Sequence, residues 1–243
     1  MSILLVTGAS RGIGAAIARL AGARHYDVAV NYLRDEKAAE AVVQAVRGAG
    51  RRAVAIQGDM AQEADVDRAF ATIDKELGRL THLVYNAGTT GGYSRLEEAD
   101  NAMMRSVLEL NVLGALMCVK AAISRMSTKK GGPGGAIVLI SSMAATLGSA
   151  GEYVWYAASK GAIDTMTVGL SRELAAENIR VNAVSPGLIQ TDLHPPGRLE
   201  RLAPMMPIAR AGLPEEVAEA VLFLLSDASS YTTGTNVRVS GGR

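Results

Sequence analysis

A regular alternation of short apolar segments with longer mixed segments runs along the whole chain, and it constrains the fold more than any other feature. Short apolar segments bounded by turn residues are typical of buried strands. They lie at 3–7, 28–32, 53–57, 83–85, 136–140, 179–184 and 236–239. The intervening segments predict helices at 15–23, 36–47, 62–77, 97–126, around 156–176 and at 214–225. This pattern predicts an α/β fold, with a doubly wound parallel sheet of about seven strands and helices on both faces.

The composition is that of an ordered globular protein. Of the 243 residues, 49% are hydrophobic and 20% are charged, which argues against disorder. The flexible stretch at 129–135 is too short to be a domain linker, so we expect residues 1–243 to form a single domain. The net charge of +1 creates no field that would attract nucleic acid or an acidic membrane surface.

The sequence also bears on cellular location, through leader and membrane-span signals, and on metal binding, through its cysteine and histidines. No leader with a cleavage site precedes the first strand, and no uninterrupted apolar run reaches the roughly 18–20 residues of a membrane span. We therefore expect a soluble, cytoplasmic protein. Cys118 is the only cysteine and lies in an apolar segment, which predicts a buried structural thiol. His25, His82 and His194 lack metal-ligand spacing, so we expect no metal site.

Polar residues and glycines gather just after the predicted strands. They are found at 8–14, 59, 86–88, 142 and 186–191. In an open doubly wound sheet, the carboxyl ends of the strands face one crevice, and ligands bind there. The shared position of these groups therefore predicts a ligand-binding crevice.

The first of these turns has the spacing of a phosphate-binding loop. Thr7, Gly8, Gly12 and Gly14 follow the pattern T-G-x-x-x-G-x-G between a buried strand and a helix. Glycines there let the backbone approach a pyrophosphate, whose charge is met by free N–H groups and the positive end of the helix dipole. The alternative is a tight turn whose glycines serve geometry alone.

Tyr156 and Lys160 lie four residues apart in a run of small residues with good helix propensity. At this spacing two side chains share one helix face, with Cβ atoms about 5–6 Å apart. A cation beside a phenol favours the phenolate, so we expect Lys160 to lower the pKa of Tyr156 and make it an acid or base near neutral pH. Taken alone, the pair also fits a tyrosine packed on a surface helix beside a lysine.

The chain resembles the short-chain dehydrogenase/reductase family over essentially all its length, and most closely the compact enzymes of the glucose dehydrogenase and 3-oxoacyl-carrier-protein reductase type. The resemblance is carried by Thr7-Gly8-x3-Gly12-x-Gly14, Asn86-Ala87-Gly88, Asn111, Ser142, Tyr156-x3-Lys160 and Pro186-Gly187 with Thr191. It implies a Rossmann-like fold and an oxidoreductase that transfers a hydride between a nicotinamide cofactor and a carbonyl or alcohol. It also implies a catalytic tetrad of Asn111, Ser142, Tyr156 and Lys160.

The physical chemistry of these four residue types agrees with those roles. Lowering the tyrosine pKa by two to three units requires about 3–4 kcal/mol, and one cation at about 4 Å supplies about 4 kcal/mol at an effective dielectric near 20. Lys160, helped by the positive nicotinamide of the oxidised cofactor, is therefore about sufficient. Ser142 would donate a hydrogen bond to the substrate oxygen, with Ser141 as the adjacent competitor. The family role of Asn111 is to interrupt its helix and hold a water that relays protons to Lys160.

Cofactor preference depends on the end of the second strand, where NAD-preferring enzymes place an acid. Tyr32 takes that position, while Arg11 and Arg34 would reach a 2′-phosphate, unless both are solvated surface charges. We expect NADP (NADPH), with NAD as the alternative. The residues expected at the cofactor, in part from the resemblance, are Gly8, Ser10, Arg11, Gly12, Ile13, Gly14, Asn31, Tyr32, Arg34, Asp59, Met60, Asn86, Ala87, Gly88, Tyr156, Lys160, Pro186, Gly187, Ile189 and Thr191.

The substrate is expected between residues 89–96, 143–155 and 192–212, where apolar walls favour a small or medium carbonyl or alcohol compound. Trp155 would either line this pocket or simply pack. The irregular segment 190–212 suggests a mobile lid. The resemblance implies a homotetramer or homodimer, with no nucleic-acid or membrane partner. A rival hypothesis is a dinucleotide-binding redox sensor without turnover, against which the intact tetrad argues.

Overall fold

Seven strands pair in parallel in the order β3–β2–β1–β4–β5–β6–β7. In the computed structural model, which describes residues 2–243, they are β1 (Ile3–Val6), β2 (Asp27–Tyr32), β3 (Ala53–Gln57), β4 (His82–Tyr85), β5 (Gly135–Ile140), β6 (Ile179–Pro186) and β7 (Asn236–Val239). The chain runs outward from β1 to β3 and then crosses to β4 on the other side of β1. Ligands of open α/β sheets bind at the strand ends beside this reversal. The predicted doubly wound parallel sheet is confirmed.

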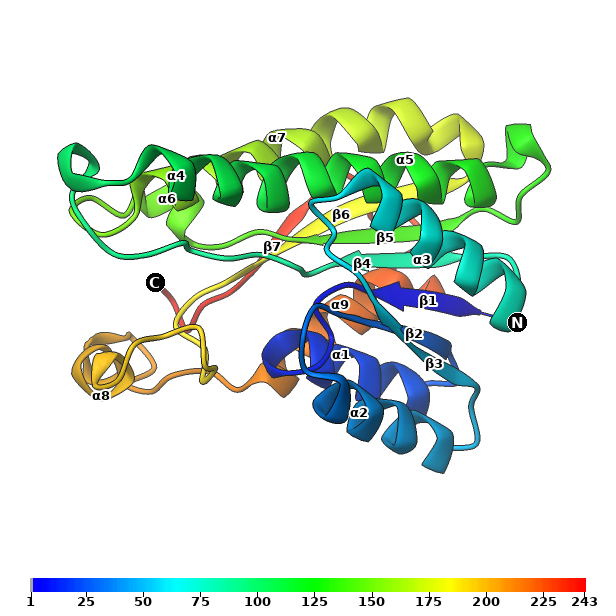
Figure 1. Cartoon of the computed structure of the whole chain (residues 1–243), viewed down its shortest axis with the longest axis horizontal. Coiled ribbons are helices and arrows are strands. Elements are labelled where there is room, and N and C mark those ends of the chain that lie inside the picture. Colours follow the sequence, from blue (N-terminus) through cyan, green and yellow to red (C-terminus); the bar gives the residue numbers. More distant parts are fainter. Residues whose placement is uncertain (1) are drawn as a thin grey trace.

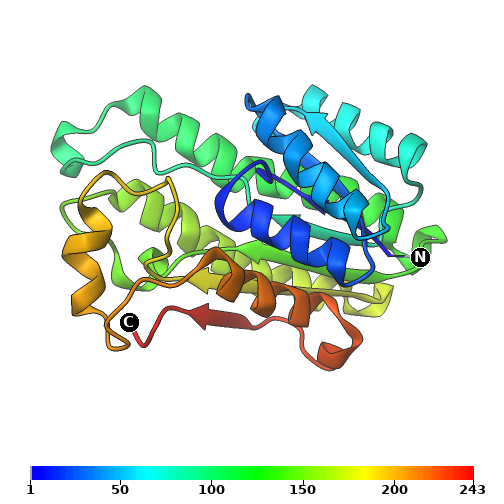
Figure 2. The same cartoon turned by 90° about the horizontal axis from the view of Figure 1, so that it is seen from below.

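Helices cover both faces of the sheet (Figure 1). One face carries α1 (Gly12–Ala23), α2 (Glu36–Gly48) and α9 (Pro214–Leu225). The other face carries α3 (Glu63–Glu76), α4 (Asn101–Leu108), α5 (Gly114–Met126) and α7 (Val154–Leu174). Figure 2 shows α1 and α9 packed side by side over the middle of the sheet. The three-layer arrangement leaves the strand ends as the open edge of the molecule.

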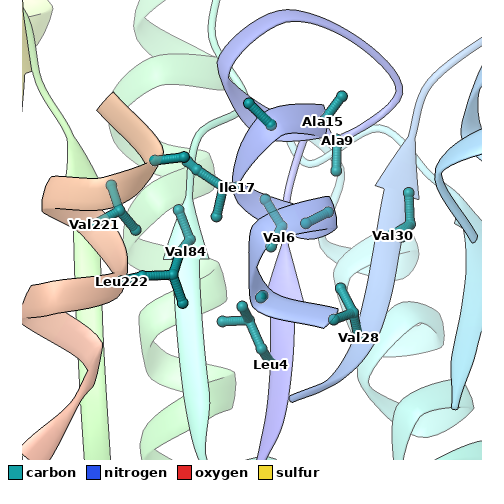
Figure 3. Close-up of a cluster of buried hydrophobic side chains, with 14 of the residues drawn as sticks. Leu4, Val6, Ala9, Ala15, Ile17, Val28, Val30, Val84, Val221 and Leu222 are labelled. Carbon is teal, nitrogen blue, oxygen red and sulfur yellow. The ribbon is translucent and has the colours of Figure 1, made fainter. Parts of the chain in front are cut away.

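The core consists of two apolar layers, because alternate residues of a strand point to opposite faces of the sheet. In β1, Leu4 and Val6 pack beneath α1 (Figure 3), whereas Ile3 and Leu5 join the layer on the opposite face. Burial on both faces explains why the inner strands, such as β1 and β5, are continuous apolar runs, whereas the edge strand β7 alternates polar and apolar residues. Each fully buried leucine contributes about 1.5–3 kcal/mol, so these two layers hold the strand ends in place.

The stretch predicted as one helix at 97–126 is divided. A 3-10 turn (Leu96–Glu98) precedes α4, and a π-helical turn (Glu109–Leu113) separates α4 from α5. Asp100 caps α4, since its carboxylate accepts a hydrogen bond from the backbone N–H of Met103 at 2.8 Å. Asn111 lies in the π turn and is fully buried. A π turn commonly marks a functional position in a helix.

Two short helices were not anticipated in regions that look irregular in the sequence. α6 (Ala144–Leu147) follows β5, and α8 (Arg198–Leu202) lies within the segment predicted as a lid. Both are too short to show a helical period in the sequence. α8 projects away from the sheet, at the same end of the molecule as α4 and α6 (Figure 1).

The helical stretch Asn101–Met126 is long and apolar enough to cross a membrane by length and composition alone. It lies in the layer formed by α3 and α7, with side chains such as Cys118, Ala122 and Met126 buried in the core. We therefore interpret it as a core helix of the α/β fold. Burial also raises the pKa of the Cys118 thiol to about 12, as expected for a structural cysteine.

Candidate active site

One cavity lies at the carboxyl ends of β4, β5 and β6, where the topology places the crevice. It brings together many of the predicted residues: Ile13, Asn86, Gly88, Ser142, Tyr156, Lys160, Pro186, Gly187, Ile189 and Thr191. It is also lined by residues of the segments expected around the substrate, namely Thr90, Tyr93, Tyr153, Leu193 and His194, by Ser141, the expected competitor of Ser142, and by Ile140, which was not predicted. Within residues 2–243, no group of three or more His, Cys, Asp or Glu lies close enough to hold a metal ion.

The glycine turn has the geometry of a phosphate cradle. Gly8 and Gly12 have φ angles of 61° and 54°, which residues other than glycine rarely adopt. A Cβ on Gly14 would lie 2.6 Å from the side-chain nitrogen of Asn86, so only glycine fits there. Arg11 precedes α1 without a side-chain cap, which leaves the first N–H groups of the helix for a ligand. Ser10, Arg11 and Gly12 line a shallow pocket here together with Thr191.

Two asparagines hold this turn against the neighbouring strands. Asn31 is buried; its side-chain oxygen accepts from the N–H of Gly8 at 3.1 Å, and its nitrogen donates to the carbonyl of Gly58 at 3.0 Å. Asn86 donates to the carbonyls of Thr7 and Gly8, both at 3.0 Å. With both ends of its amide bonded to the backbone, Asn31 supports the turn from behind and does not line the cavity.

Thr7 is a supporting residue that we did not place among the site residues. It is fully buried, and its hydroxyl accepts from the N–H groups of Asn86 and Ala87 at 2.9 and 3.0 Å. This ties the loop after β4 to the end of β1. The signal that marks it is its position directly before Gly8, at the end of a buried strand.

The residues expected around the adenosine lie away from the catalytic cavity. The side chains of Tyr32 and Met60 are buried in the core, and the carboxylate of Asp59 accepts from the N–H of Ala61 at 3.0 Å. Arg34 is exposed, as is Arg11. Of these, only the exposed arginines present free side chains to a ligand beside the β2 end.

The four predicted catalytic residues come from three elements. Tyr156 and Lys160 lie on α7, Ser142 follows β5, and Asn111 lies in the π turn. Lys160 is 5% exposed, and its ammonium donates to the carbonyl of Ile140 at 2.7 Å. The same nitrogen lies 5.7 Å from the centre of the Tyr156 ring. α7 and the end of β5 therefore hold the phenol and the ammonium in one buried site.

The pKa of Tyr156 lies above its ordinary value, whereas we expect Lys160 and the positive nicotinamide of the oxidised cofactor to lower it together. Burial raises the pKa of Tyr156 to about 12, despite an opposing hydrogen bond with Ser142. Burial also lowers the pKa of Lys160 to about 8, although the nearby Asp164 raises it. The expectation counts the attraction of cations for a phenolate and omits the desolvation of both groups, which raises the pKa of the phenol and lowers that of the ammonium. The positive charge expected from the oxidised cofactor is therefore still needed to bring the pKa of Tyr156 toward 7.

The two adjacent serines after β5 have different surroundings. The hydroxyl of Ser142 faces Tyr156 and accepts from the N–H of Ala144 at 3.1 Å. Ser141 is buried, and its hydroxyl is 2.5 Å from a carboxylate oxygen of Asp164 and 3.2 Å from the carbonyl of Lys160. Ser142 is thus the serine with a hydroxyl directed at the phenol, while the hydroxyl of Ser141 is occupied by Asp164 and the carbonyl of Lys160.

Asn111 bonds the loop after β4 to α7. Its side-chain nitrogen donates to the carbonyl of Thr89 and to the hydroxyl of Ser159, both at 3.0 Å, and its oxygen accepts from the N–H of Thr89 at 2.9 Å. A Cβ on Gly88 would lie 3.2 Å from this oxygen and 3.6 Å from the ammonium of Lys160. The amide and the ammonium therefore flank the same glycine.

An aromatic wall completes the cavity, and two of its tyrosines come from segments 89–96 and 143–155, which were expected around the substrate. Tyr93 packs edge to face against Tyr153, with ring centres 4.9 Å apart, and Tyr153 packs in the same way against Tyr156 at 5.3 Å. Arg198 of α8 lies over Tyr93 and Tyr153 and forms a two-bond ion pair with Glu152, at 2.7 and 2.8 Å. Trp155 packs in the same apolar cluster as Tyr153 and Tyr156 but does not line the cavity, and its indole donates to the carbonyl of Thr90 at 2.8 Å.

Comparison with known proteins decides the family. A family model described as enoyl-(acyl carrier protein) reductase matches residues 8–243. The chain is 47% identical to the uncharacterized oxidoreductase YgfF of Escherichia coli, with all of both chains covered. It is 37% identical to a 3-oxoacyl-[acyl-carrier-protein] reductase of Synechocystis, covering 99% of this chain and 96% of the relative.

The chain belongs to the short-chain dehydrogenase/reductase family. A solved structure of a short chain dehydrogenase from Burkholderia cenocepacia in complex with NADP is similar over 99% of this chain and 97% of its own, with a TM-score of 0.92 and 35% identity. The protein is accordingly an NAD(P)-dependent oxidoreductase that acts on CH–OH or C=O groups of small molecules. The uncapped start of α1 and the glycine cradle described above fit the phosphates of such a cofactor.

Proposed function

We propose that this protein is an NADP(H)-dependent oxidoreductase in which Tyr156 exchanges the proton with the carbonyl or alcohol oxygen of the substrate. The observation that carries the proposal is the convergence of the Tyr156 phenol, the Ser142 hydroxyl and the Lys160 ammonium on one cavity. A carbonyl oxygen that gains negative charge during reduction needs both a proton donor and a hydrogen-bond donor. Tyr156 and Ser142 would provide them.

The proposed proton path uses residues of this chain. Tyr156 gives its proton to the substrate oxygen during reduction and takes it back during oxidation, while Ser142 donates a hydrogen bond to the same oxygen. Lys160 stabilises the phenolate, and Asn111 holds the backbone beside the ammonium. When bound, the cofactor supplies or accepts the hydride, and its oxidised form adds positive charge near the phenol. This added charge opposes the raised pKa of Tyr156.

The preference for NADP over NAD is supported by the charges around the end of β2. Arg11 and Arg34 are exposed there, and Tyr32, where an acid would hold ribose hydroxyls, is buried. A 2′-phosphate carries nearly two negative charges at neutral pH, so two exposed guanidinium groups favour it. Replacing Arg34 by Glu should therefore reduce kcat/KM for NADPH more than for NADH.

The substrate class is a small carbonyl or alcohol compound. The cavity has a volume of about 130 Å³, and tyrosine rings line it. Relatives include 3-oxoacyl-[acyl-carrier-protein] reductases, so β-ketoacyl thioesters belong among the candidates. We further propose that residues 1–243 act as one domain, that the protein works in the cytoplasm, and that it assembles as a homotetramer.

The test is oxidation of NADPH and of NADH with a panel of ketones, diketones, quinones and acyl thioesters. Wild-type protein should turn over at least one class, and Tyr156→Phe should lower kcat by about 10²–10⁴-fold, which is the usual contribution of a general acid. Tyr153→Phe removes a hydroxyl from the same cavity and should cost far less. Undiminished activity of Tyr156→Phe would refute the mechanism. Tight cofactor binding without turnover of any compound would favour the redox-sensor alternative.

A further inference from the structure

Asp164 lies one helical turn beyond Lys160 on α7, and it is held by side chains from two strands. Its carboxylate oxygen is 2.5 Å from the hydroxyl of Ser141, which follows β5, and 2.7 Å from the amide nitrogen of Asn236 on β7. The hydroxyl of Ser141 also contacts the carbonyl of Lys160 at 3.2 Å. A carboxylate with two such donors is both oriented and favoured in its ionised form.

Lys160 lies between Tyr156 and Asp164 on α7, four residues from each, so the three side chains share one helix face. Ser141, which binds the carboxylate, directly follows Ile140, whose carbonyl accepts from the ammonium, so both groups meet the end of β5. Lys160 is nearly completely buried, and its ammonium donates to one backbone carbonyl, that of Ile140. Burial disfavours its charged form, and the carboxylate of Asp164 is the group that opposes this effect. The proposed mechanism needs a charged ammonium beside Tyr156, so the arrangement leaves Asp164 to maintain that charge.

The other ionisable groups around Lys160 and Asp164 are compatible with a charged ammonium and an ionised carboxylate. Tyr156 and Tyr153 face the cavity side and keep raised pKa values, so they are neutral at pH 7. The charge of Arg238, on β7, favours the carboxylate of Asp164. The pKa of Asp164 is nevertheless raised from its usual value, chiefly because of burial. The hydrogen bonds of Ser141 and Asn236 therefore matter to keep it ionised.

We propose that Asp164 is a positioning residue for the proton transfer, with its carboxylate, fixed by Ser141 and Asn236, keeping the ammonium of Lys160 charged. It touches neither substrate nor cofactor and acts through Lys160. This inference rests on the proposed function, since it assigns a purpose to the charge of Lys160. It also assigns a purpose to Ser141, the serine that the Tyr156 mechanism does not use.

The first test needs no turnover. Protein labelled with ¹³C at the lysine side chains is titrated by NMR, and the Lys160 signal is identified by its loss in Lys160→Met. Asp164→Asn keeps the shape and one acceptor oxygen but removes the charge, and it should lower the pKa of Lys160 by about one to two pH units. Ser141→Ala should give a smaller shift in the same direction. An unchanged Lys160 titration in both variants would overturn the inference.

The second test uses the pH profile of kcat/KM. In Asp164→Asn, the alkaline limb that reports loss of the Lys160 proton should move to lower pH, with about a five- to ten-fold loss of activity near pH 8. Glu173→Gln removes an exposed carboxylate from the same helix and should leave the profile unchanged. A uniform loss of activity without a shift in the profile would mean that Asp164 is only structural. Absence of turnover in the wild type would refute the proposed function but leave the NMR result valid.

Discussion

Burial of the Lys160 ammonium lowers the stability of the folded protein, although the proposed catalysis needs this charge. Taking an ammonium out of water costs free energy, and the lowered pKa of about 8 in the folded protein measures that cost relative to the unfolded chain. Because the folded pKa is depressed, the penalty is full below pH 8, shrinks as pH rises and is gone above the unfolded value of 10.5. The site therefore keeps its charge at the expense of stability.

Replacing Lys160 by Met should stabilise the protein while abolishing catalysis. The variant removes a buried charge, partly offset by leaving the carbonyl of Ile140 without its donor, and we expect a gain of about 1–2 kcal/mol in the free energy of unfolding at pH 7. Denaturant unfolding at several pH values measures it, and the gain should vanish above about pH 10.5. Lys120→Met, at an exposed position of α5, is the control. A gain that persists unchanged at high pH would contradict the account.

At the scale of elements, Arg198 of α8 binds the loop before α7 and so holds the segment predicted as a lid against the wall of the cavity. Arg198 is 8% exposed, and besides its ion pair with Glu152 it donates to the hydroxyl of Tyr153 at 3.0 Å. Removing Glu152's side chain would leave the buried guanidinium without its two hydrogen-bonding carboxylate oxygens, which is costly although Glu152 itself is partly exposed. Arg198 therefore connects the lid segment to the same tyrosine that packs against Tyr156.

Arg198→Met should loosen the lid. We expect a several-fold higher KM for the carbonyl substrate with a smaller change in kcat, since Tyr156 and Lys160 stay in place while the wall of the cavity loses its anchor. Limited proteolysis should cut the segment 190–212 faster in the variant. Arg210→Met is the matched control, because Arg210 forms an exposed ion pair with Glu216 near the end of the same segment. Equal proteolysis rates in both variants would show that Arg198 does not hold the lid.

At the scale of the whole molecule, exposed apolar side chains gather on the outer face of α4, the π turn and α5. Leu108, Leu113 and Leu116 are 44–49% exposed there, and Val168 on the neighbouring α7 is 40% exposed. Large apolar side chains clustered on a surface mark interaction sites. This face is where we expect copies of the chain to meet in the proposed homotetramer.

Charges on this face should dissociate the assembly. Light scattering coupled to size-exclusion chromatography should give a tetramer for the wild type and smaller species for Leu113→Asp combined with Leu116→Asp, because each carboxylate would be buried without a partner. Leu33→Asp alters an equally exposed leucine beside β2 and should leave the mass unchanged. A monomeric wild type would refute the assembly.

The sequence predicted the strands and most of the helices closely, because their signals are local. β1, β2 and β5 are buried runs bounded by turn residues, and α9 begins at Pro214 as expected. The glycine turn could also be located, since positive φ angles and close backbone contacts at Gly8 and Gly14 demand glycine. α6 and α8 were missed because one helical turn leaves no period to detect.

What only the tertiary structure decided is how the crevice is filled. Tyr156 and Lys160 were found by their spacing, but the direction of their pKa shifts depends on burial, which is produced by residues far apart in the chain. The Ser141 contact with Asp164 and the Arg198 contact with Glu152 likewise join segments 23 and 46 residues apart. Spacing along a chain determines which residues share a helix face; desolvation and long-range pairing depend on packing, which the spacing alone does not contain.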